Sequence, residues 1–497
     1  GPGSAAALQP SRSMAASDPS APGAPSALRA VSLCVLLALL AWSGAVARGG
    51  FAFDDAEAVR ANPVVEGGAP WWSAFQRDYW DHVSPAGHYR PLATLSLRLD
   101  QALWGSQAPA GWHLTTVLLH ALVVALAGLA LIRLPPRASG PAALPWAGLA
   151  LFATHPALAD SVAWISGRTS MLSAVAPLAG ACVLLLALGR AGRPTLVSLA
   201  VALIASALGL LGGLLGKEDA IVFAGVLLLM AWRSGPRARL AVAAGCALGI
   251  LAYLVLRAQA LGAALPRAPH APLAGEPLGV RLTVAGRALL ELLRLAVLPL
   301  GYPPSYDRDP RLEPSAALDA VPLAVAGWLP WLTLVVLGVS RLRRGPASPV
   351  PASALLAALS LVPLLQLVPS GALRAPRFLY LPLLLAIPLV HAAWSSLPAA
   401  GRRPLAALAL AACVLGAWSR AGVYADRASY HLTVLAHRPD DPPAWNELGL
   451  AWEEQGRRPE SRAAFERAAA LDPGYSRPWS NLGRLALEDG DLAQAER

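Results

Sequence analysis

The sequence predicts an all-α protein with two parts, a polytopic bundle of membrane-spanning helices and a C-terminal helical solenoid. Hydrophobic residues make up 56% of the 497 residues and charged residues only 14%, a balance outside the range of soluble globular proteins. The apolar residues are also grouped into runs close to the roughly 20 residues that cross a bilayer core. A regular repeat near the C-terminus predicts the solenoid.

Eleven apolar runs predict about eleven spans within a transmembrane domain at 28–421. The first run is interpreted as a span and not as a signal peptide because of its length. The Ala/Pro/Ser-rich residues 1–27 are expected to form a disordered tail, with 1–13 a tag or an incomplete start and Met14 the true start. The runs are 28–46, 113–132, 146–165, 170–188, 195–215, 219–232, 240–260, 320–339, 352–368, 378–397 and 404–418.

Arginine placement predicts the orientation of the bundle. Five short basic connections are expected on the cytoplasmic side, since short cytoplasmic loops carry an excess of basic residues. If the spans alternate in direction from a cytoplasmic N-terminus, all five connections fall on the cytoplasmic side only when the stretch 282–300 does not cross the membrane. Its Arg287, Glu291 and Arg294 form a charged stripe on one helical face, which predicts an amphipathic helix in the outer interface. The loop 47–112 and the C-terminus then lie outside. The basic connections are 133–137, 190–193, 233–239, 341–344 and 402–403.

The segment 424–497 shows the tetratricopeptide pattern. Adding 34 residues to Trp445, Leu448 and Gly449 gives Trp479, Leu482 and Gly483, and a fixed period of 34 predicts paired helices that pack as repeats. The chain stops inside the second helix of the last repeat without a polar capping helix, so the natural protein is expected to continue. Further residues that match the pattern are Trp452, Phe465, Ala468 and Pro473.

Charge and cysteine usage exclude some classes of function. The net charge of +10 is explained by the cytoplasmic connections, and no zinc-finger, basic-region or RNA-binding pattern occurs, so nucleic acid is not an expected partner. The cysteines lack both metal-ligand spacing and a disulfide framework, and are interpreted as small core residues. No cofactor is expected, although Asp54, Asp55 and His82 could chelate a divalent metal. The cysteines are Cys34, Cys182, Cys246 and Cys413.

Candidate chemistry gathers at the outer face. Asp54 and Asp55 follow the first span directly, where an acidic pair would meet a substrate held at the interface. The alternative interpretation is a helix N-cap, because Asp before the stretch AEAV is a good cap. Both interpretations stay open at this stage.

Further ionisable residues point to the same face. His155 and Asp160 fall within an apolar run with Arg168 at its outer end. Such residues mark functional sites, unless they only neutralise one another inside the bundle. Lys217 is the only lysine among 40 basic residues. It either compensates an anionic substrate, or neutralises Glu218 or Asp219, or stands there by chance. Alternation also places Glu218, Arg377 and Tyr380 outside.

Six blocks resemble, in order, those of the transmembrane and tetratricopeptide-repeat O-mannosyltransferases. They are FDDAEAVRANP, YRPLATLSL, GWHLTTVLLHA, LFATHPALADSVAWISGRTSML, GKEDA and RFLYLP. The family pattern reads as an aspartate pair, YRPL, HxxNxxLH, HPIHTEAVA-GRADLL, KEQGI and ERxLYLP, and the resemblance covers roughly residues 50–497. The chain departs from this pattern at Thr116 (family Asn), Asp160 (Glu), Ser170 (Asp), Asp219 (Gln) and Pro376 (Glu).

The resemblance implies a GT-C fold, a polyprenyl-phosphate-linked sugar as donor and a first-loop aspartate as the catalytic acid-base residue. Asp54, with Asp55, occupies the matching position. The resemblance also implies that the repeats capture a protein acceptor. The residues expected to bind the donor and its lipid phosphate are Arg90, Arg168, Lys217, Arg377 and Tyr380, with support from His113, His155, Asp160 and Glu218.

The predicted function is transfer of a sugar, mannose favoured, to a Ser or Thr hydroxyl of a protein. A carboxylate can deprotonate the hydroxyl, cations can stabilise the leaving phosphate, and a single displacement would invert the anomeric carbon. Two alternatives are a non-enzymatic membrane scaffold whose repeats dock proteins, and a transporter, which would show repeated halves around midplane charges. The residue bias towards Arg, Ala and Pro predicts a bacterial inner membrane with a periplasmic active face, or a luminal face in the endoplasmic reticulum if the source is eukaryotic.

Overall fold

The structure, a computed structural model, describes residues 24–83, 86–133, 146–189, 194–264, 273–304, 321–343, 349–367 and 373–491. These residues form helices and turns and contain no strand, which confirms the all-α prediction. The long helices are α1 (Ala24–Arg48), α4 (Pro109–Arg133), α7 (Thr169–Leu188), α8 (Leu196–Gly216), α10 (Pro236–Leu261), α11 (Leu278–Val297), α12 (Val321–Arg343) and α16 (Ala399–Ala421).

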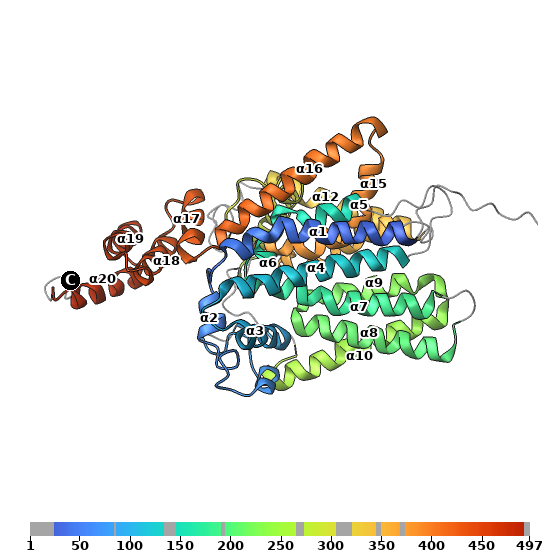
Figure 1. The fold of residues 1–497 in the computed structure, drawn as a ribbon, viewed down its shortest axis with the longest axis horizontal. Coiled ribbons are helices and arrows are strands. Elements are labelled where there is room, and N and C mark those ends of the chain that lie inside the picture. Colours follow the sequence, from blue (N-terminus) through green and yellow to red (C-terminus); the bar gives the residue numbers. More distant parts are fainter. Residues whose placement is uncertain are drawn as a thin grey trace, which may run out of the picture.

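The long helices pack side by side into a bundle. Helix α1 contacts α4 and α16, α4 contacts α7, and α8 lies between α7 and α10. Figure 1 shows these helices running along one direction, with the C-terminal helices extending from one end of the bundle. All four cysteines are free, and Cys34 and Cys246 are buried between the packed helices.

The structure contains fewer full-length spans than the eleven that the sequence predicts. Seven described helices are long and apolar enough to cross a membrane, or eight if the bent pair Pro376–Leu385 and Ile387–Ser395 forms one span. Three predicted spans are short helices: α5 (Trp146–Thr154), α9 (Phe223–Met230) and α13 (Pro349–Leu359). None of the three approaches the roughly 20 residues needed. Pro156, which has no backbone N–H to donate, follows α5 closely, so the apolar run continues in short 3-10 and α turns.

Helix α11 carries the predicted charged stripe. Arg294 pairs with Glu291 at 2.7 Å on its surface, and α11 is not among the helices that meet the length and composition of a span. Helix α11 also packs closely on α12, because a Cβ atom at Gly327 would lie 1.8 Å from the carbonyl oxygen of Gly286. The close glycine contact holds the helix firmly against its neighbour.

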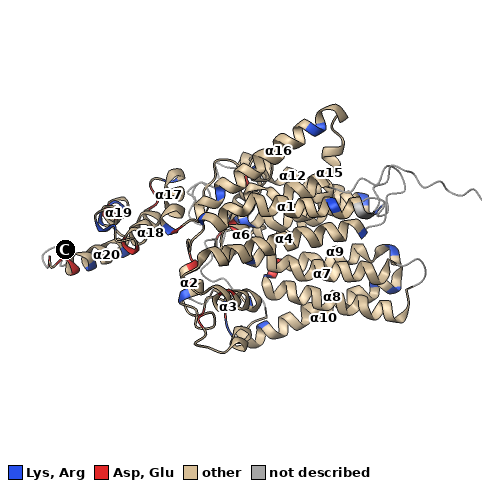
Figure 2. Cartoon of the chain, in the orientation of Figure 1, with Lys and Arg blue, Asp and Glu red and all other residues tan. Residues whose placement is uncertain are grey.

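Charge is distributed unevenly along the bundle. Figure 2 shows basic residues at the bundle end that lies away from the repeats, and acidic residues towards the end that carries them. Arg133 ends α4, Arg233 lies in the turn between α9 and α10, and Arg239 lies in the first turn of α10. The distribution agrees with the positive-inside pattern on which the predicted orientation depends. Residues 134–137, 190–193 and Arg344 of the predicted connections lie outside the described residues, as does most of the predicted N-terminal tail.

The end of the bundle from which the repeats extend is built from short elements. They connect the long helices and carry most of the polar side chains discussed below. They are α2 (Asp55–Arg60), η1 (Trp71–Gln76), α3 (Pro91–Trp104), η2 (Pro156–Leu158), α6 (Ala159–Val162), η3 (Ser166–Arg168), η4 (Glu218–Val222), η10 (Pro376–Leu379), α14 (Tyr380–Leu385) and η11 (Gly422–Tyr424). Helix α15 (Ile387–Ser395) lies at the other end of the bundle (Figure 1).

The C-terminal helices form the predicted repeats. The Trp445 indole N–H donates to the carbonyl of Pro439 at 2.8 Å, and Trp479, 34 residues later, makes the same contact with Pro473 at 3.1 Å. Gly449 lies against Phe465, where a Cβ atom would be only 2.5 Å from the ring. The four helices are α17 (Arg427–His437), α18 (Pro442–Glu454), α19 (Arg458–Leu471) and α20 (Ser476–Glu488).

Candidate active site

Asp54 lies in the turn between α1 and α2, at the end of the bundle that carries the repeats. It occupies the N-cap position of α2, but its side chain makes no capping hydrogen bond. The side chain is half-buried, and its Oδ1 is shielded from solvent without a hydrogen bond from any described residue. Burial and the neighbouring Asp55 charge raise the pKa of Asp54 well above its usual value, while Arg377 opposes the rise. A buried carboxylate with a raised pKa is a stronger base than a free aspartate.

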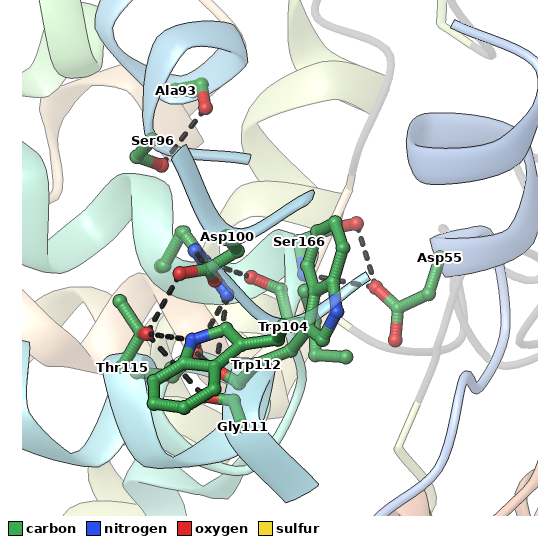
Figure 3. Close-up of polar contacts among 12 residues, drawn as sticks. Asp55, Ala93, Ser96, Asp100, Trp104, Gly111, Trp112, Thr115 and Ser166 are labelled. Atoms are coloured by element: carbon green, nitrogen blue, oxygen red, sulfur yellow. Dashed lines mark hydrogen bonds and ion pairs between the residues drawn. The ribbon is translucent and has the colours of Figure 1, made fainter. Parts of the chain in front are cut away.

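Asp55 has a different environment and a different set of contacts. Its Oδ1 accepts hydrogen bonds from the backbone N–H of Ser166 at 2.9 Å and from the Ser166 hydroxyl at 2.7 Å. Its Oδ2 accepts from the backbone N–H of Ala52 at 3.2 Å. Burial raises the pKa of Asp55 to about 6 against these hydrogen bonds. Figure 3 shows Asp55 directed at Ser166, so this carboxyl group joins the first loop to η3.

Arg377 is the cation whose charge lowers the pKa of Asp54. Its guanidinium lies 5.5 Å from the ring centre of Trp164 and 5.6 Å from that of Phe378. The side chain is half-buried and makes no ion pair or hydrogen bond with any residue that the structure describes. Its positive charge opposes the rise in the pKa of both Asp54 and Asp160. Arg377 therefore has its hydrogen-bond donors available for an anion.

Asp160 lies on α6 and is joined to the start of the repeat region. Its Oδ1 accepts a hydrogen bond from the hydroxyl of Tyr424 at 2.5 Å, and both side chains are about 1% exposed. Arg420 also acts on the Asp160 charge, while its guanidinium lies 4.0 Å from the ring centre of Tyr302. Burial raises the pKa of Asp160 to about 6, against the hydrogen bond from Tyr424 and the charges of Arg420 and Arg377, which lower it.

Lys217 ends α8 and is paired within the protein. Its Nζ lies 2.8 Å from Asp219 Oδ2 and donates to the Ser170 hydroxyl at 3.2 Å. The same ammonium group lies 5.7 Å from the ring centre of Phe378, the ring that Arg377 also contacts. Both Ser170 and Asp219 are positions where the sequence departs from the family pattern. Of the three interpretations of the lone lysine, this geometry favours neutralisation of Asp219.

Arg90 and Glu218 form a second charged pair at the start of η4. Arg90 Nη2 lies 3.2 Å from Glu218 Oε2, and Arg257 of α10 lies 3.8 Å from Oε1. Burial raises the pKa of Glu218, but Arg90, His88 and Arg257 outweigh burial and hold it at about 2. Glu218 is therefore ionised at neutral pH, and it compensates the charge of Arg90.

Arg168 does not reach an open site. Its Nη1 lies 2.5 Å from Asp100 Oδ2, and the two side chains are 1% and 0% exposed. Its Nη2 donates to the carbonyl of Trp112 and to the hydroxyl of Thr116, both at 3.1 Å. Asp100 in turn accepts from Thr115 at 2.7 Å, as Figure 3 shows. The expectation that Arg168 binds a lipid phosphate is not supported by this geometry, because its donors are used inside the protein.

Three other predicted residues are bound within the fold. Tyr380 is fully buried, and its hydroxyl lies 3.0 Å from His120 Nδ1, so the donor-binding role expected for it is not supported. His155 Nε2 lies 3.1 Å from the carbonyl of Ala296, and its Nδ1 accepts the backbone N–H of Ala157. His113 contacts the carbonyl of Gly50 at 2.9 Å, and it thereby supports the turn that leads to Asp54.

Four residues near these groups were not identified from the sequence. Trp164 falls inside a quoted block, so attention to aromatic residues there could have found it. Asp100 and Arg420 had no local signal, since their partners lie far away in the sequence. Tyr79 is 5% exposed with a hydroxyl that has no hydrogen bond among the described residues, and burial followed by the Asp54 charge raises its pKa.

The described residues contain no group of three or more His, Cys, Asp or Glu side chains arranged to hold a metal ion. In particular, His82 lies near the carbonyl of Glu57 at 2.9 Å and near Asp81 at 3.7 Å. The cluster that remains combines one carboxylate oxygen and one guanidinium, those of Asp54 and Arg377, neither of which has a hydrogen-bond partner among the described residues. Such a pair can remove a proton from a hydroxyl and stabilise an anionic leaving group.

Comparison with known families identifies the repeat region. The family model described as tetratricopeptide repeat matches residues 442–475, which covers the whole of α18 and of α19. No solved structure matches the chain.

Comparison with curated proteins identifies relatives of one kind. The chain is 38% identical over 133 residues to protein O-mannosyl-transferase Tmtc2 of Drosophila melanogaster, covering 25% of this chain and 13% of the relative. It is 38% identical over 130 residues to Tmtc1 of the same species, covering 25% and 15%. It is 34% identical over 146 residues to human TMTC4, covering 26% and 19%. The chain thus spans less than a fifth of the length of these relatives. The comparisons confirm its resemblance to the transmembrane and tetratricopeptide-repeat O-mannosyltransferase family.

Proposed function

We propose that the protein is a membrane glycosyltransferase that transfers a sugar, mannose favoured, from a polyprenyl-phosphate donor to a Ser or Thr hydroxyl of a protein. The observation that carries the proposal is that Asp54, which has an unsatisfied oxygen, lies within the electrostatic influence of Arg377. Asp54 offers an unsatisfied carboxylate oxygen with a raised pKa, and Arg377 offers an unpaired guanidinium whose charge acts on it. The similarity to proteins named O-mannosyl-transferases supports the class of reaction.

In the proposed step, the Asp54 carboxylate accepts the proton of the acceptor hydroxyl. The hydroxyl oxygen forms a bond to the anomeric carbon as the bond between that carbon and the phosphate oxygen breaks. The electron pair leaves with the phosphate, and the configuration at the anomeric carbon is inverted. Arg377 stabilises the negative charge that develops on the phosphate, because a guanidinium matches phosphate geometry with two parallel hydrogen bonds.

The location of the residues supports a reaction at the membrane surface. Asp54 follows α1 by six residues, and Arg377 begins the bent helix pair. A polyprenyl-phosphate donor would keep its chain in the bilayer and bring its phosphate to this level. The repeats extend from the same end of the bundle (Figure 1), where they can hold a protein acceptor. We place this end on the outer face of the membrane, which is periplasmic in a bacterial inner membrane.

The test is a transfer assay with the full chain in lipid nanodiscs. Labelled polyprenyl-phosphate mannose is added with candidate acceptor proteins, and the acceptors are analysed by mass spectrometry. We expect an added hexose on Ser or Thr that requires Asp54. Retained binding of protein partners without transfer from any polyprenyl-phosphate sugar would instead favour a membrane-anchored scaffold.

A further inference from the structure

A row of aromatic rings joins the first repeat helix to the candidate active site. The ring of Phe53, the residue before Asp54, stacks on Tyr430 of α17 with centres 4.8 Å apart and planes at 21°. On its other side, Phe53 lies 5.8 Å from Trp164, the ring that Arg377 contacts. Phe53 is therefore held between the repeat region and the cation of the site.

The backbone of Phe53 has an unusual conformation. Its φ is 52°, in the left-handed region, which is strained for any residue that carries a Cβ atom. Such a conformation persists only where the surroundings hold it in place. Because Phe53 immediately precedes Asp54, its φ and ψ set the direction in which Asp54 leaves the turn.

Two further contacts fix the same junction. The backbone N–H of Gly50 donates to the carbonyl of Tyr424 at 3.2 Å, and the hydroxyl of Tyr424 donates to Asp160. Arg427 of α17 lies 4.0 Å from Glu57 of α2. The turn that carries Asp54 is thus attached to the start of the repeats on both sides of Asp54.

We infer that the first repeat helix is part of the catalytic centre, and that Tyr430 is a positioning residue. Its ring holds Phe53 in the left-handed conformation, and Phe53 in turn directs Asp54 towards the substrate. The inference rests on the proposed function, since it assigns a role in that reaction. A solenoid that served only to bind the acceptor would need no contact with the turn before the base.

The test compares substitutions of Tyr430 in the full-length chain in nanodiscs. Tyr430→Leu keeps an apolar side chain at this buried position but removes the aromatic stack, Tyr430→Ala removes more volume, and Tyr430→Phe keeps the ring. The matched control is Trp331→Leu, which removes one ring of the Trp328–Trp331 pair, 5.6 Å apart on α12. The measurements are kcat, KM for the donor, the pH profile, and hydrogen exchange of a peptide that covers residues 51–57.

We expect Tyr430→Leu to lower kcat by roughly tenfold, which corresponds to the free energy of one aromatic contact, and to leave KM for the donor unchanged. Exchange at 51–57 should become faster and the acid limb of the pH profile should move. Tyr430→Phe should restore all three properties, and Trp331→Leu should change none of them. Faster exchange without a change in kcat or pH profile would reduce Tyr430 to a structural contact and overturn the inference.

Hydrogen exchange separates this inference from the proposed function. It reports on the coupling between Tyr430 and the Asp54 turn even if the wild-type protein transfers no sugar. Faster exchange in Tyr430→Leu and Tyr430→Ala, together with an inactive wild type, would support the coupling and remove the glycosyltransferase assignment. Unchanged exchange at 51–57 in both variants would overturn the inference whatever the activity.

Discussion

Asp54 and Asp55 are adjacent in sequence, yet only Asp55 is satisfied by hydrogen bonds within the protein. Asp55 accepts three hydrogen bonds, two of them from Ser166, whereas Asp54 Oδ1 accepts none from the described residues. The difference divides the acidic pair into a residue that is free to react and a residue that fixes the turn. The helix-cap interpretation of Asp54 receives no support from its side chain, which makes no capping hydrogen bond.

We predict that Asp54→Asn removes turnover while the protein still folds and binds the donor. The substitution keeps the shape of the side chain but deletes the base, and loss of a general base costs roughly 10²- to 10⁴-fold in rate. Single-turnover kinetics and donor binding by the same preparation measure the two properties.

The neighbouring acids provide the controls for this prediction. Asp55→Asn should mainly lower thermal stability, because an amide nitrogen would face the Ala52 N–H or the Ser166 donors. Glu66→Gln, an exposed acid of the same loop, should leave turnover unchanged. Full activity in both Asp54→Asn and Asp55→Asn would show that the pair only begins a helix.

The second prediction concerns the pH dependence set by Arg377. The base must be deprotonated to act, so activity should rise with pH through the pKa of Asp54. Arg377 lowers that pKa, so Arg377→Gln should raise it and move the acid limb of kcat to higher pH. The lost contact with the phosphate should also raise KM for the donor by roughly ten- to a hundred-fold.

Arg377→Lys is the matched variant for this prediction. It keeps the charge but loses the planar fork, so it should restore the position of the acid limb more fully than KM. The measurement is a pH series of initial rates at several donor concentrations. An acid limb that stays in place in Arg377→Gln would mean that Arg377 does not act on the base.

The third prediction follows from the pairing of Lys217 with Asp219. Lys217→Gln leaves a largely buried carboxylate without its partner, and breaking such a pair costs on the order of 3 kcal/mol. Thermal stability should therefore fall. The additional change Asp219→Asn should restore it, whereas Glu218→Gln should not, because Glu218 pairs with Arg90. Rescue by Glu218→Gln alone, or a large rise in donor KM at unchanged stability, would contradict this assignment.

Local patterns in the sequence predicted the repeats well, because Trp445 and Trp479 each contact a proline only six residues away. The acidic pair and the polar blocks were also placed together by alternation of spans. The partners of single charges were not predictable. Whether Lys217 pairs with Glu218 or with Asp219 depends on how the 3-10 turn η4 directs these two adjacent carboxylates. Tyr380 shares a block with Arg377, but three residues along the bent helix pair its side chain lies in the bundle interior.

The number of spans shows a second limit of sequence reasoning. Hydropathy counts apolar residues, and it does not register where a helix breaks. Residues 146–165 are apolar enough for a span, yet α5 ends at Thr154 and α6 has only four residues. The break brings Asp160 next to Tyr424 and Trp164 next to Arg377, so the departure from the expected span is also what builds the candidate site.

The fourth prediction treats Arg168 as a structural cation. Its ion pair with Asp100 is almost completely buried, and removing one partner of such a pair leaves an uncompensated charge that costs about 3–5 kcal/mol. Asp100→Asn and Arg168→Met should each lower thermal stability strongly. The paired variant Asp100→Leu with Arg168→Met should recover much of it, since an apolar pair of similar volume replaces a buried ion pair at little cost. Thermal unfolding in detergent measures the relative stabilities of the wild type, the two single variants and the paired variant. The KM of the paired variant for the donor then decides the role of Arg168. A KM close to that of the wild type means that the guanidinium only holds η3 against α3. A KM that is tenfold higher or more, at recovered stability, would mean that Arg168 binds the donor phosphate.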